Sequence, residues 1–307
     1  MDVTGGFGAL DPELLGVVLN DLDATSVPAF LLVCRRWREA LVIHRRSRGI
    51  RGKRRHGSFG AGSAYTTALI ERRMPNLVRW AHACGAPLAR TACREIAGTG
   101  DLDLLRWARS EGLCCDQETC AEAARGGHLG MLKWLRANDC PWDERTCIAA
   151  AANGCLDVLR WARTNGCPWD RRTCHRAAEC GHLEVLKWAR SNGCPWDMDT
   201  CTMAATNGHL GVLEWARAGG CPSWGEAICA GAAGGGHLEV LRWARANGCR
   251  WDKWTCALAA KGGHLDVLQW ARANGCPWDR WTTIRAAQGG HADVMAWTKA
   301  NGCPQLD

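Results

Sequence analysis

The sequence contains few phenylalanine and tyrosine residues, the aromatic residues that usually help to fill a protein core. Its 307 residues include 3 Phe and 1 Tyr, yet they include 18 Trp and 20 Cys. Globular domains do not normally have this composition. The tryptophans and cysteines therefore need an explanation other than general core packing.

Long apolar runs are also missing from the sequence. No stretch of 18 apolar residues indicates a membrane-spanning helix, and the opening residues, MDVTGGFGALDPELLG, lack the basic segment and apolar run of a secretory signal peptide. We expect a soluble protein of a reducing compartment, in the cytoplasm or the nucleus, with no membrane partner. Disulfides are rare in such a compartment.

Patterns typical of catalysis are missing as well. The sequence shows no Ser/His/Asp constellation, no paired carboxylates and no phosphate-binding glycine loop. The glycine-rich stretch GAAGGGH at 231–237 is the turn of a repeat described below. We therefore expect a protein that is not an enzyme and that binds no cofactor or metal.

One repeated phrase accounts for much of the unusual composition. GCLDVLRWARTNGCPWDRRTC at 154–174 returns 27 residues later as GHLEVLKWARSNGCPWDMDTC at 181–201. Tryptophans mark this period of 27 residues, with one interval of 28, at Trp80, Trp107, Trp134, Trp161, Trp188, Trp215, Trp243, Trp270 and Trp297. A period of this length indicates a solenoid, in which each repeat packs against its neighbours. We expect about nine repeats over residues 63–307.

Residues 170–196, DRRTCHRAAECGHLEVLKWARSNGCPW, indicate how one repeat is built. Asp170 is the expected N-cap of a short first helix that ends before Gly181. A second helix is expected from Leu183 to Ser191, and Gly193 ends it in a left-handed conformation. Core candidates of this helix are Leu183, Leu186 and Trp188.

A pair of alanines recurs at one place in the first helix. Small side chains allow neighbouring helices to approach to about 8–10 Å, so these pairs are the expected stacking seam between repeats. The pairs are Ala123 and Ala124, Ala150 and Ala151, Ala204 and Ala205, Ala232 and Ala233, Ala259 and Ala260, and Ala286 and Ala287.

The pattern TCxxAAxxGHLxVLxWxxxNG resembles a shortened ankyrin repeat, T-P-L-H-x-A-A-x-x-G-H-x-x-V-V-x-L-L. Its matching positions are Thr173, Ala177, Ala178, Gly181, His182 and Val185. The repeat has 27 residues, whereas an ankyrin repeat has about 33, because the loop at 193–200 is too short for a β-hairpin finger. Short Trp- and Cys-rich repeats of this kind are similar to those of giant DNA viruses and of some algae and related protists. The resemblance implies an all-α solenoid that binds proteins.

Fourteen cysteines form two tracks, which are Cys93, Cys120, Cys147, Cys174, Cys201, Cys229 and Cys256, and Cys140, Cys167, Cys194, Cys221, Cys249, Cys276 and Cys303. A zinc site would use paired ligands such as CxxC, which these tracks lack. Disulfides are disfavoured in a reducing compartment, so we expect buried thiols that pack as small apolar groups. The adjacent Cys114 and Cys115 are the one pair that needs a separate test.

Histidine and tryptophan recur with the same period. The histidines, His128, His182, His209, His237, His264 and His291, lie too far apart along a solenoid to share one metal ion. The ankyrin resemblance implies that each lies at the turn between helices and bonds backbone groups. The nine tryptophans of the second helices are expected in the core, since each can bury about 150–250 Å².

The segment before the repeats has a different pattern. Residues 10–41, LDPELLGVVLNDLDATSVPAFLLVCRRWREAL, predict a helix with Asp11 as N-cap and an apolar stripe from Leu14 to Leu22. The segment strongly resembles an F-box, L-P-x-E-L-L-x-x-I-L-x-x-L followed by V-C-(K/R)-x-W-(R/K). The resemblance implies a three-helix domain at 8–43 that binds the Skp adaptor of a cullin-RING ubiquitin ligase through Leu10, Pro12, Leu14, Leu15, Val18, Leu19, Val33 and Trp37. The alternative is an amphipathic cap for the first repeat.

A basic linker at 44–62 follows this segment. It carries Arg45, Arg46, Arg48, Arg51, Lys53, Arg54 and Arg55, which match the formal net charge of +7 of the whole chain. Nuclear import or nucleic-acid contact would explain the charge, and so would a solvated linker. No aromatic side chain is interleaved among these cations, so we do not expect nucleic acid as a partner.

The two positions before each repeated threonine vary between repeats, so we expect them to contact a target protein. Trp254 and Trp281 are the predicted anchors, and the expected surrounding contacts are Arg171, Arg172, Lys253 and Arg280. The alternative is that both rings pack on a neighbouring loop. The chain is thus predicted to be a substrate-recruiting subunit of a Skp-cullin-F-box ligase, monomeric within its complex. A scaffold or decoy without a role in ubiquitination is the alternative, and a nucleic-acid-binding protein is a third.

Overall fold

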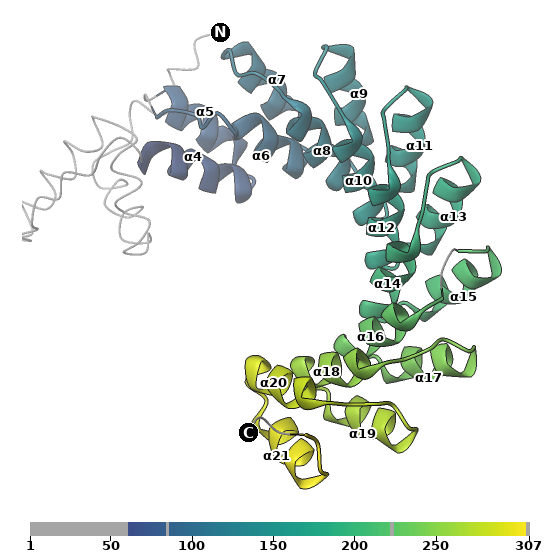
Figure 1. The fold of residues 1–307 in the computed structure, drawn as a ribbon. Helices are drawn as coiled ribbons and strands as arrows, with labels where there is room; N and C mark the ends of the chain where they lie inside the picture. Colours follow the sequence, from purple (N-terminus) through teal and green to yellow (C-terminus); the bar gives the residue numbers. More distant parts are fainter. Residues whose placement is uncertain (1–60, 84–85, 222–223, 305–307) are drawn as a thin grey trace, which may run out of the picture. The chain divides into compact units, whose positions relative to one another are not determined.

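A computed structural model describes residues 61–83, 86–221 and 224–304 (Figure 1). The predicted F-box segment 8–43 and the basic residues of the linker lie outside the described residues. Every regular element of the described part is an α-helix, and these 18 helices form nine consecutive pairs. Each pair is one repeat, as the tryptophan period predicts.

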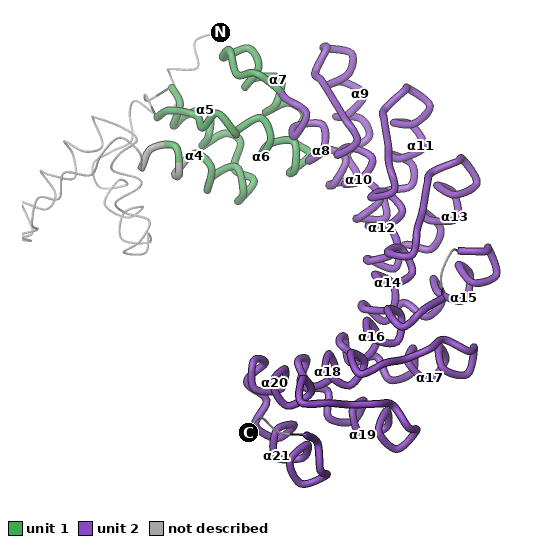
Figure 2. The backbone as a smooth tube through the Cα atoms, in the orientation of Figure 1, with its two compact units in different colours: residues 1–115 green, residues 116–307 purple. Residues whose placement is uncertain are grey.

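The chain divides into two compact units, residues 1–115 and 116–307 (Figure 2). Unit 1 contains α4 (Ala61–Glu71), α5 (Pro75–Ala83), α6 (Ala92–Thr99) and α7 (Leu102–Ser110). The first helices of the pairs in unit 2 are α8 (Gln117–Arg125), α10 (Glu144–Ala152), α12 (Arg171–Glu179), α14 (Met198–Thr206), α16 (Glu226–Gly234), α18 (Lys253–Gly262) and α20 (Arg280–Gly289). The second helices are α9 (Leu129–Ala137), α11 (Leu156–Thr164), α13 (Leu183–Ser191), α15 (Leu210–Ala218), α17 (Leu238–Ala246), α19 (Leu265–Ala273) and α21 (Ala292–Ala300).

The first helices of unit 2 line the inner side of a curve, and the second helices lie outside them (Figure 1). We call them the inner and outer helices. Each inner helix packs on the next inner helix, whereas each outer helix packs mainly on the inner helix of its own pair. The alanine pairs on the inner helices, for example Ala177 and Ala178, are fully buried, except that Ala287 of the last inner helix is exposed. Small side chains therefore bring the inner helices together while the outer helices spread apart, which curves the row.

Local sequence sets the limits of each helix. The Asp170 side chain accepts a hydrogen bond from the Arg172 backbone N–H at 2.9 Å, as expected of an N-cap. The second helix of this repeat spans Leu183–Ser191, as predicted. Gly181 has φ +74°, and a Cβ there would approach His209 Nδ1 to 2.6 Å. Glycine is thus required at position 181 because the backbone is left-handed there and because the His209 ring of the next repeat leaves no room for a side chain.

Four of the six recurring histidines, His182, His209, His264 and His291, bond to the backbone of the preceding repeat. His182 Nε2 donates to the Ala152 carbonyl at 3.1 Å, and His209 Nε2 donates to the Glu179 carbonyl at 2.9 Å. Both carbonyls belong to the last residue of an inner helix. At that end of a helix, no backbone N–H of the same helix is available to bond the carbonyl. This confirms the predicted structural role of these histidines.

The prediction that the nine recurring tryptophans belong to the core is wrong, because all of them are only partly buried. The core of the outer helix α13 consists of Val185, Leu186 and Ala189. Trp188 instead contacts Trp169 of the preceding loop edge to face, with ring centroids 5.8 Å apart. Arg163 of α11 lies over the Trp169 ring, 4.2 Å from its centroid. The tryptophans thus form a partly exposed stack with arginines, and large aromatic surfaces gain from such contacts without full burial.

Candidate protein-interaction surface

The variable positions before each threonine form the first turn of every inner helix in unit 2. Three of the five exposed large apolar side chains within the described residues occupy these positions, namely Met198, Trp254 and Trp281. The other two, Met74 and Met295, lie elsewhere. Exposed apolar side chains are thus concentrated where the sequence varies, which is typical of a binding surface.

Trp254 and Trp281 lie on the neighbouring inner helices α18 and α20. Their ring centroids are 6.3 Å apart and the rings are inclined by 32°. The two residues remain 38% and 36% exposed. The rings thus contact each other and still offer a large apolar surface to a partner.

Arg285 completes this aromatic cluster. Its guanidinium carbon lies 5.7 Å from the Trp254 ring and 5.9 Å from the Trp281 ring. Cation–π attraction at such distances holds a cation beside both rings. Sequence reasoning missed Arg285 because it follows Trp281 by one helical turn and lies outside the variable pair.

Two other predicted contact residues, Arg171 and Arg172, form ion pairs with neighbouring repeats. Arg171 lies 3.5 Å from an Asp197 oxygen, and Arg172 donates to Asp170 and to Glu144 at 2.8 and 3.0 Å. Burial raises the pKa of the Asp170 carboxyl, but the hydrogen bonds and charge of Arg172 outweigh it and lower the pKa overall. These arginines therefore already have carboxylate partners.

Lys253 and Arg280 lie closer to the tryptophans. Lys253 is the first residue of α18, directly before Trp254, and it pairs with Asp279, the N-cap residue of α20, at 3.0 Å. Arg280 is exposed at the start of α20. The structure thus brings Trp254, Trp281 and Lys253 together, and places Arg171 and Arg172 on the separate helix α12.

A hollow of about 330 Å³ opens over the inner helix α16. Its lining residues are Thr206, Ala230, Gly231, Gly234, Leu258, Lys261 and Gly262, from α14, α16 and α18. Helix α16 has the sequence EAICAGAAG and contributes no side chain longer than a methyl group to this lining. The sequence predicted the alanine pair and a turn in this stretch, and it did not predict the hollow.

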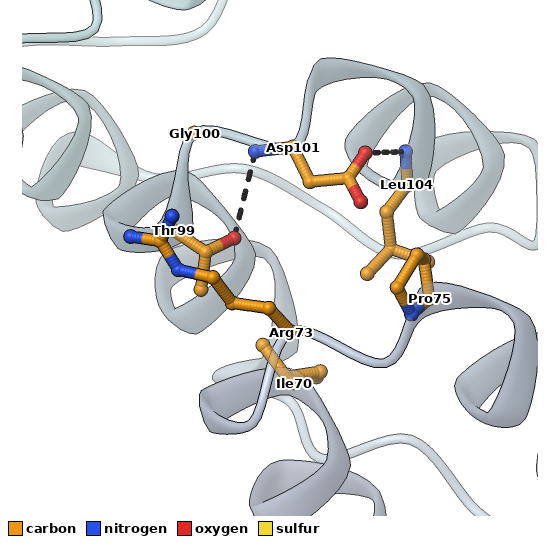
Figure 3. A pocket seen from close by; sticks show the side chains of 7 residues that line it. All are labelled: Ile70, Arg73, Pro75, Thr99, Gly100, Asp101 and Leu104. Atoms are coloured by element: carbon orange, nitrogen blue, oxygen red, sulfur yellow. Dashed lines mark hydrogen bonds between the residues drawn. The ribbon is translucent and has the colours of Figure 1, made fainter.

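A smaller hollow of about 260 Å³ lies in unit 1, between α4 and α7 (Figure 3). Its polar groups already serve the backbone, since the Asp101 side chain accepts from the Leu104 N–H at 2.8 Å. Thr99 Oγ1 lies 3.5 Å from the Asp101 N–H. These contacts fix the start of α7.

The described residues bring one group of possible metal ligands together, namely His175, Asp197 and Asp199. His175 Nε2 lies 2.6 Å from one Asp197 oxygen, and Arg171 lies 3.5 Å from the other. The nearby arginine competes with a cation for the same carboxylate. The geometry is that of an ion-pair cluster between α12 and α14.

The track cysteines form buried pairs, which the sequence analysis did not predict. Each inner-helix thiol meets the thiol 20 residues later, as in Cys120 and Cys140, whose sulfurs are 3.5 Å apart. Cys194 in turn donates to the Asp170 carbonyl at 3.4 Å. The hydrogen bond to Cys194, together with burial, raises the pKa of the Cys174 thiol. All track cysteines of the described residues are buried and none of them forms a disulfide, which confirms their predicted packing role.

Comparisons with known proteins identify part of the repeat region. The family model of ankyrin repeats in many copies matches residues 147–190, from α10 into α13. A crystal structure of the human ASB11 ankyrin repeat domain is similar at 18% identity and a TM-score of 0.43, covering 52% of this chain and 84% of that chain. No curated protein matches the chain. Residues 147–190 are thus ankyrin repeats, which indicate a role in protein–protein interaction. None of the described helices has the length and apolarity that a membrane crossing requires.

Proposed function

We propose that the chain uses its ankyrin repeats to capture a target protein and its N-terminal segment to join a Skp-type adaptor of a cullin-RING ubiquitin ligase. The observation that supports capture is the exposed cluster of Trp254, Trp281 and Arg285 on the inner helices. Tryptophan and arginine are the residues most enriched among those that dominate interface energies.

The ligase part of the proposal depends on the F-box resemblance of residues 8–43. Leu14, Leu15, Val18 and Leu19 make up one apolar stripe of the expected first helix. A helix of this length buries too little surface by itself, so its stripe needs a partner. Such an arrangement requires no catalytic residue in this chain, because holding a target beside a ubiquitin-conjugating enzyme raises its effective concentration. The expected compartment is the cytoplasm or the nucleus, in the host cell if the chain is viral.

Co-precipitation of a purified Skp-type adaptor with the full chain tests this proposal. Retention of the adaptor supports a ligase subunit. A chain that captures proteins through its repeats but does not retain the adaptor is a scaffold or decoy, which is the second candidate function. The same aromatic cluster supports this second candidate, since it acts independently of residues 8–43.

A further inference from the structure

The hollow over α16 has no counterpart in the inner helices on either side of it. The positions of Gly231 and Gly234 are occupied by Met203 and Thr206 in α14 and by Leu258 and Lys261 in α18. Glycine within a helix costs about 1 kcal/mol relative to alanine, so α16 is built at some cost in stability. The missing side chains leave the space of about 330 Å³ between the neighbouring helices.

The glycines also explain how the hollow keeps its shape. A Cβ on Gly231 would come within 2.6 Å of Thr206 Oγ1, and a Cβ on Gly234 would come within 3.2 Å of Leu258 Cβ. Thr206 is itself held by a hydrogen bond to the Thr202 carbonyl at 2.9 Å. Close packing of α16 against both neighbours therefore fixes the walls of the hollow before any ligand arrives.

Leu258 connects the hollow to the aromatic cluster. It lines the hollow and lies four residues after Trp254 on α18, so both side chains share one face of this helix. Trp254 then contacts Trp281 on α20. The inner face thus offers apolar side chains from the hollow at α16 to the tryptophan pair on α18 and α20.

Among the charged side chains next to the hollow itself, only cations occur. At the repeat positions that surround the hollow, α14, α16, α18 and α20 carry Lys261 and Arg285 and no carboxylate. Within the described part of unit 2, no acidic side chain lies within ion-pair distance of Lys261. The equivalent cation in α8 is Arg125, which pairs with Glu122 at 3.1 Å. Lys261, the one cation that lines the hollow, therefore has no carboxylate partner among the described residues.

We propose that this surface binds an acidic segment of a partner protein, with an apolar side chain of the segment in the hollow and a neighbouring carboxylate at Lys261. The Trp254–Trp281 pair covers the apolar part of the segment, and Arg285 contacts a further acidic group. Charge complementarity selects an acidic segment over a basic one. This inference deepens the proposed capture of a target protein and rests on it.

The test uses the full chain and fluorescein-labelled peptides that carry a central Leu, Phe or Trp flanked by Asp and Glu. The same peptides with Lys in place of every acidic residue are the comparison, and fluorescence anisotropy measures binding. We expect the acidic peptides to bind at least about tenfold more tightly than their Lys counterparts. Equal or tighter binding of the Lys peptides overturns the proposal.

Substitutions then locate the site. Ala230→Met fills the hollow and Lys261→Glu reverses its charge, and each should weaken binding of the acidic peptides about tenfold. The matched controls are Ile148→Met and Arg125→Glu, which introduce the same residues at the same repeat positions in α10 and α8. The controls should leave binding unchanged within about twofold. Equal effects of the site and control variants contradict the assignment.

Two further outcomes are decisive. If Ala230→Met lowers the unfolding temperature, the effect of Lys261→Glu on peptide binding decides the test, because Lys261 is exposed and its substitution should not disturb the fold.

A labelled single-stranded oligothymidine would show a nucleic-acid site instead if it bound more tightly than every acidic peptide and if the Trp254→Ser variant no longer bound it. Adaptor retention is measured on the same variants. If the adaptor is not retained while the acidic peptides still bind, only the ligase proposal is refuted. If the adaptor is retained while the acidic peptides do not bind, only this inference is refuted.

Discussion

The Thr283 hydroxyl donates a hydrogen bond to the Cys303 sulfur at 3.5 Å, in the place where other repeats of unit 2 pair two thiols. The equivalent sulfurs of Cys120 and Cys140 are 3.5 Å apart. A hydroxyl thus makes the contact that a thiol makes elsewhere. This indicates that the position needs a small hydrogen-bond donor and does not need thiol chemistry.

Substitutions at Cys174 test this interpretation. Cys174→Thr copies Thr283 and should lower the free energy of unfolding by less than about 1 kcal/mol. Cys174→Leu should cost about 1–3 kcal/mol, because it overfills a site with no exposed surface. Denaturant unfolding of both variants gives the comparison. A Thr variant as unstable as the Leu variant would mean that sulfur itself is required.

Reductant and chelator provide a second test. The cysteines of the described residues are free, and those of the two tracks there are buried. Neither treatment should therefore change the far-UV helical signal or the melting temperature of the pure protein. A decrease of several degrees with chelator alone would show that a bound metal supports the repeats.

Helix capping gives a third prediction. Asp170 caps α12, whereas Gly225 begins α16 without a side-chain cap. Asp170→Ala should destabilise the protein by about 1 kcal/mol, and Gly225→Asp should stabilise it by a few tenths of a kcal/mol. Gly225 has φ −110°, which a side chain tolerates. If Gly225→Asp is destabilising, the start of α16 is set by something other than its cap.

The adaptor-binding prediction concerns Leu14 and Leu19. Replacing both with alanine should abolish retention of the Skp-type adaptor, because it removes the centre of the apolar stripe. The far-UV signal should change little, since helices α4 to α21 contain neither residue. Unchanged retention in the pull-down would exclude the F-box assignment and favour the amphipathic cap.

The repeat period and local helix signals were sufficient to predict the helical part of the fold. Asp170, Gly181 and the limits Leu183–Ser191 follow from capping and left-handed glycine, which depend on nearby sequence. The burial of the tryptophans could not be predicted in this way. Trp188 is large enough for a core, but Trp169 and the arginines over the rings hold it at the surface.

The candidate site was only partly predictable for a related reason. Trp254 and Trp281 are recognisable because they vary in an otherwise constant repeat, yet their contact depends on the stacking of α18 on α20. Arg285 and the glycines of α16 belong to the site through packing between repeats. No pattern within one repeat shows which residues of the next repeat lie opposite.

Proximity labelling in cells with the wild-type chain and with the Trp254→Ser, Trp281→Ser variant tests the central claim most directly. Both forms should label the Skp-type adaptor, and only the wild type should label a set of target proteins, because the variant loses its aromatic anchors. The double substitution should lower the melting temperature by no more than about 4 °C, since both rings are partly exposed. Retention of the same targets by the variant, or absence of the adaptor with the wild type, would contradict the account.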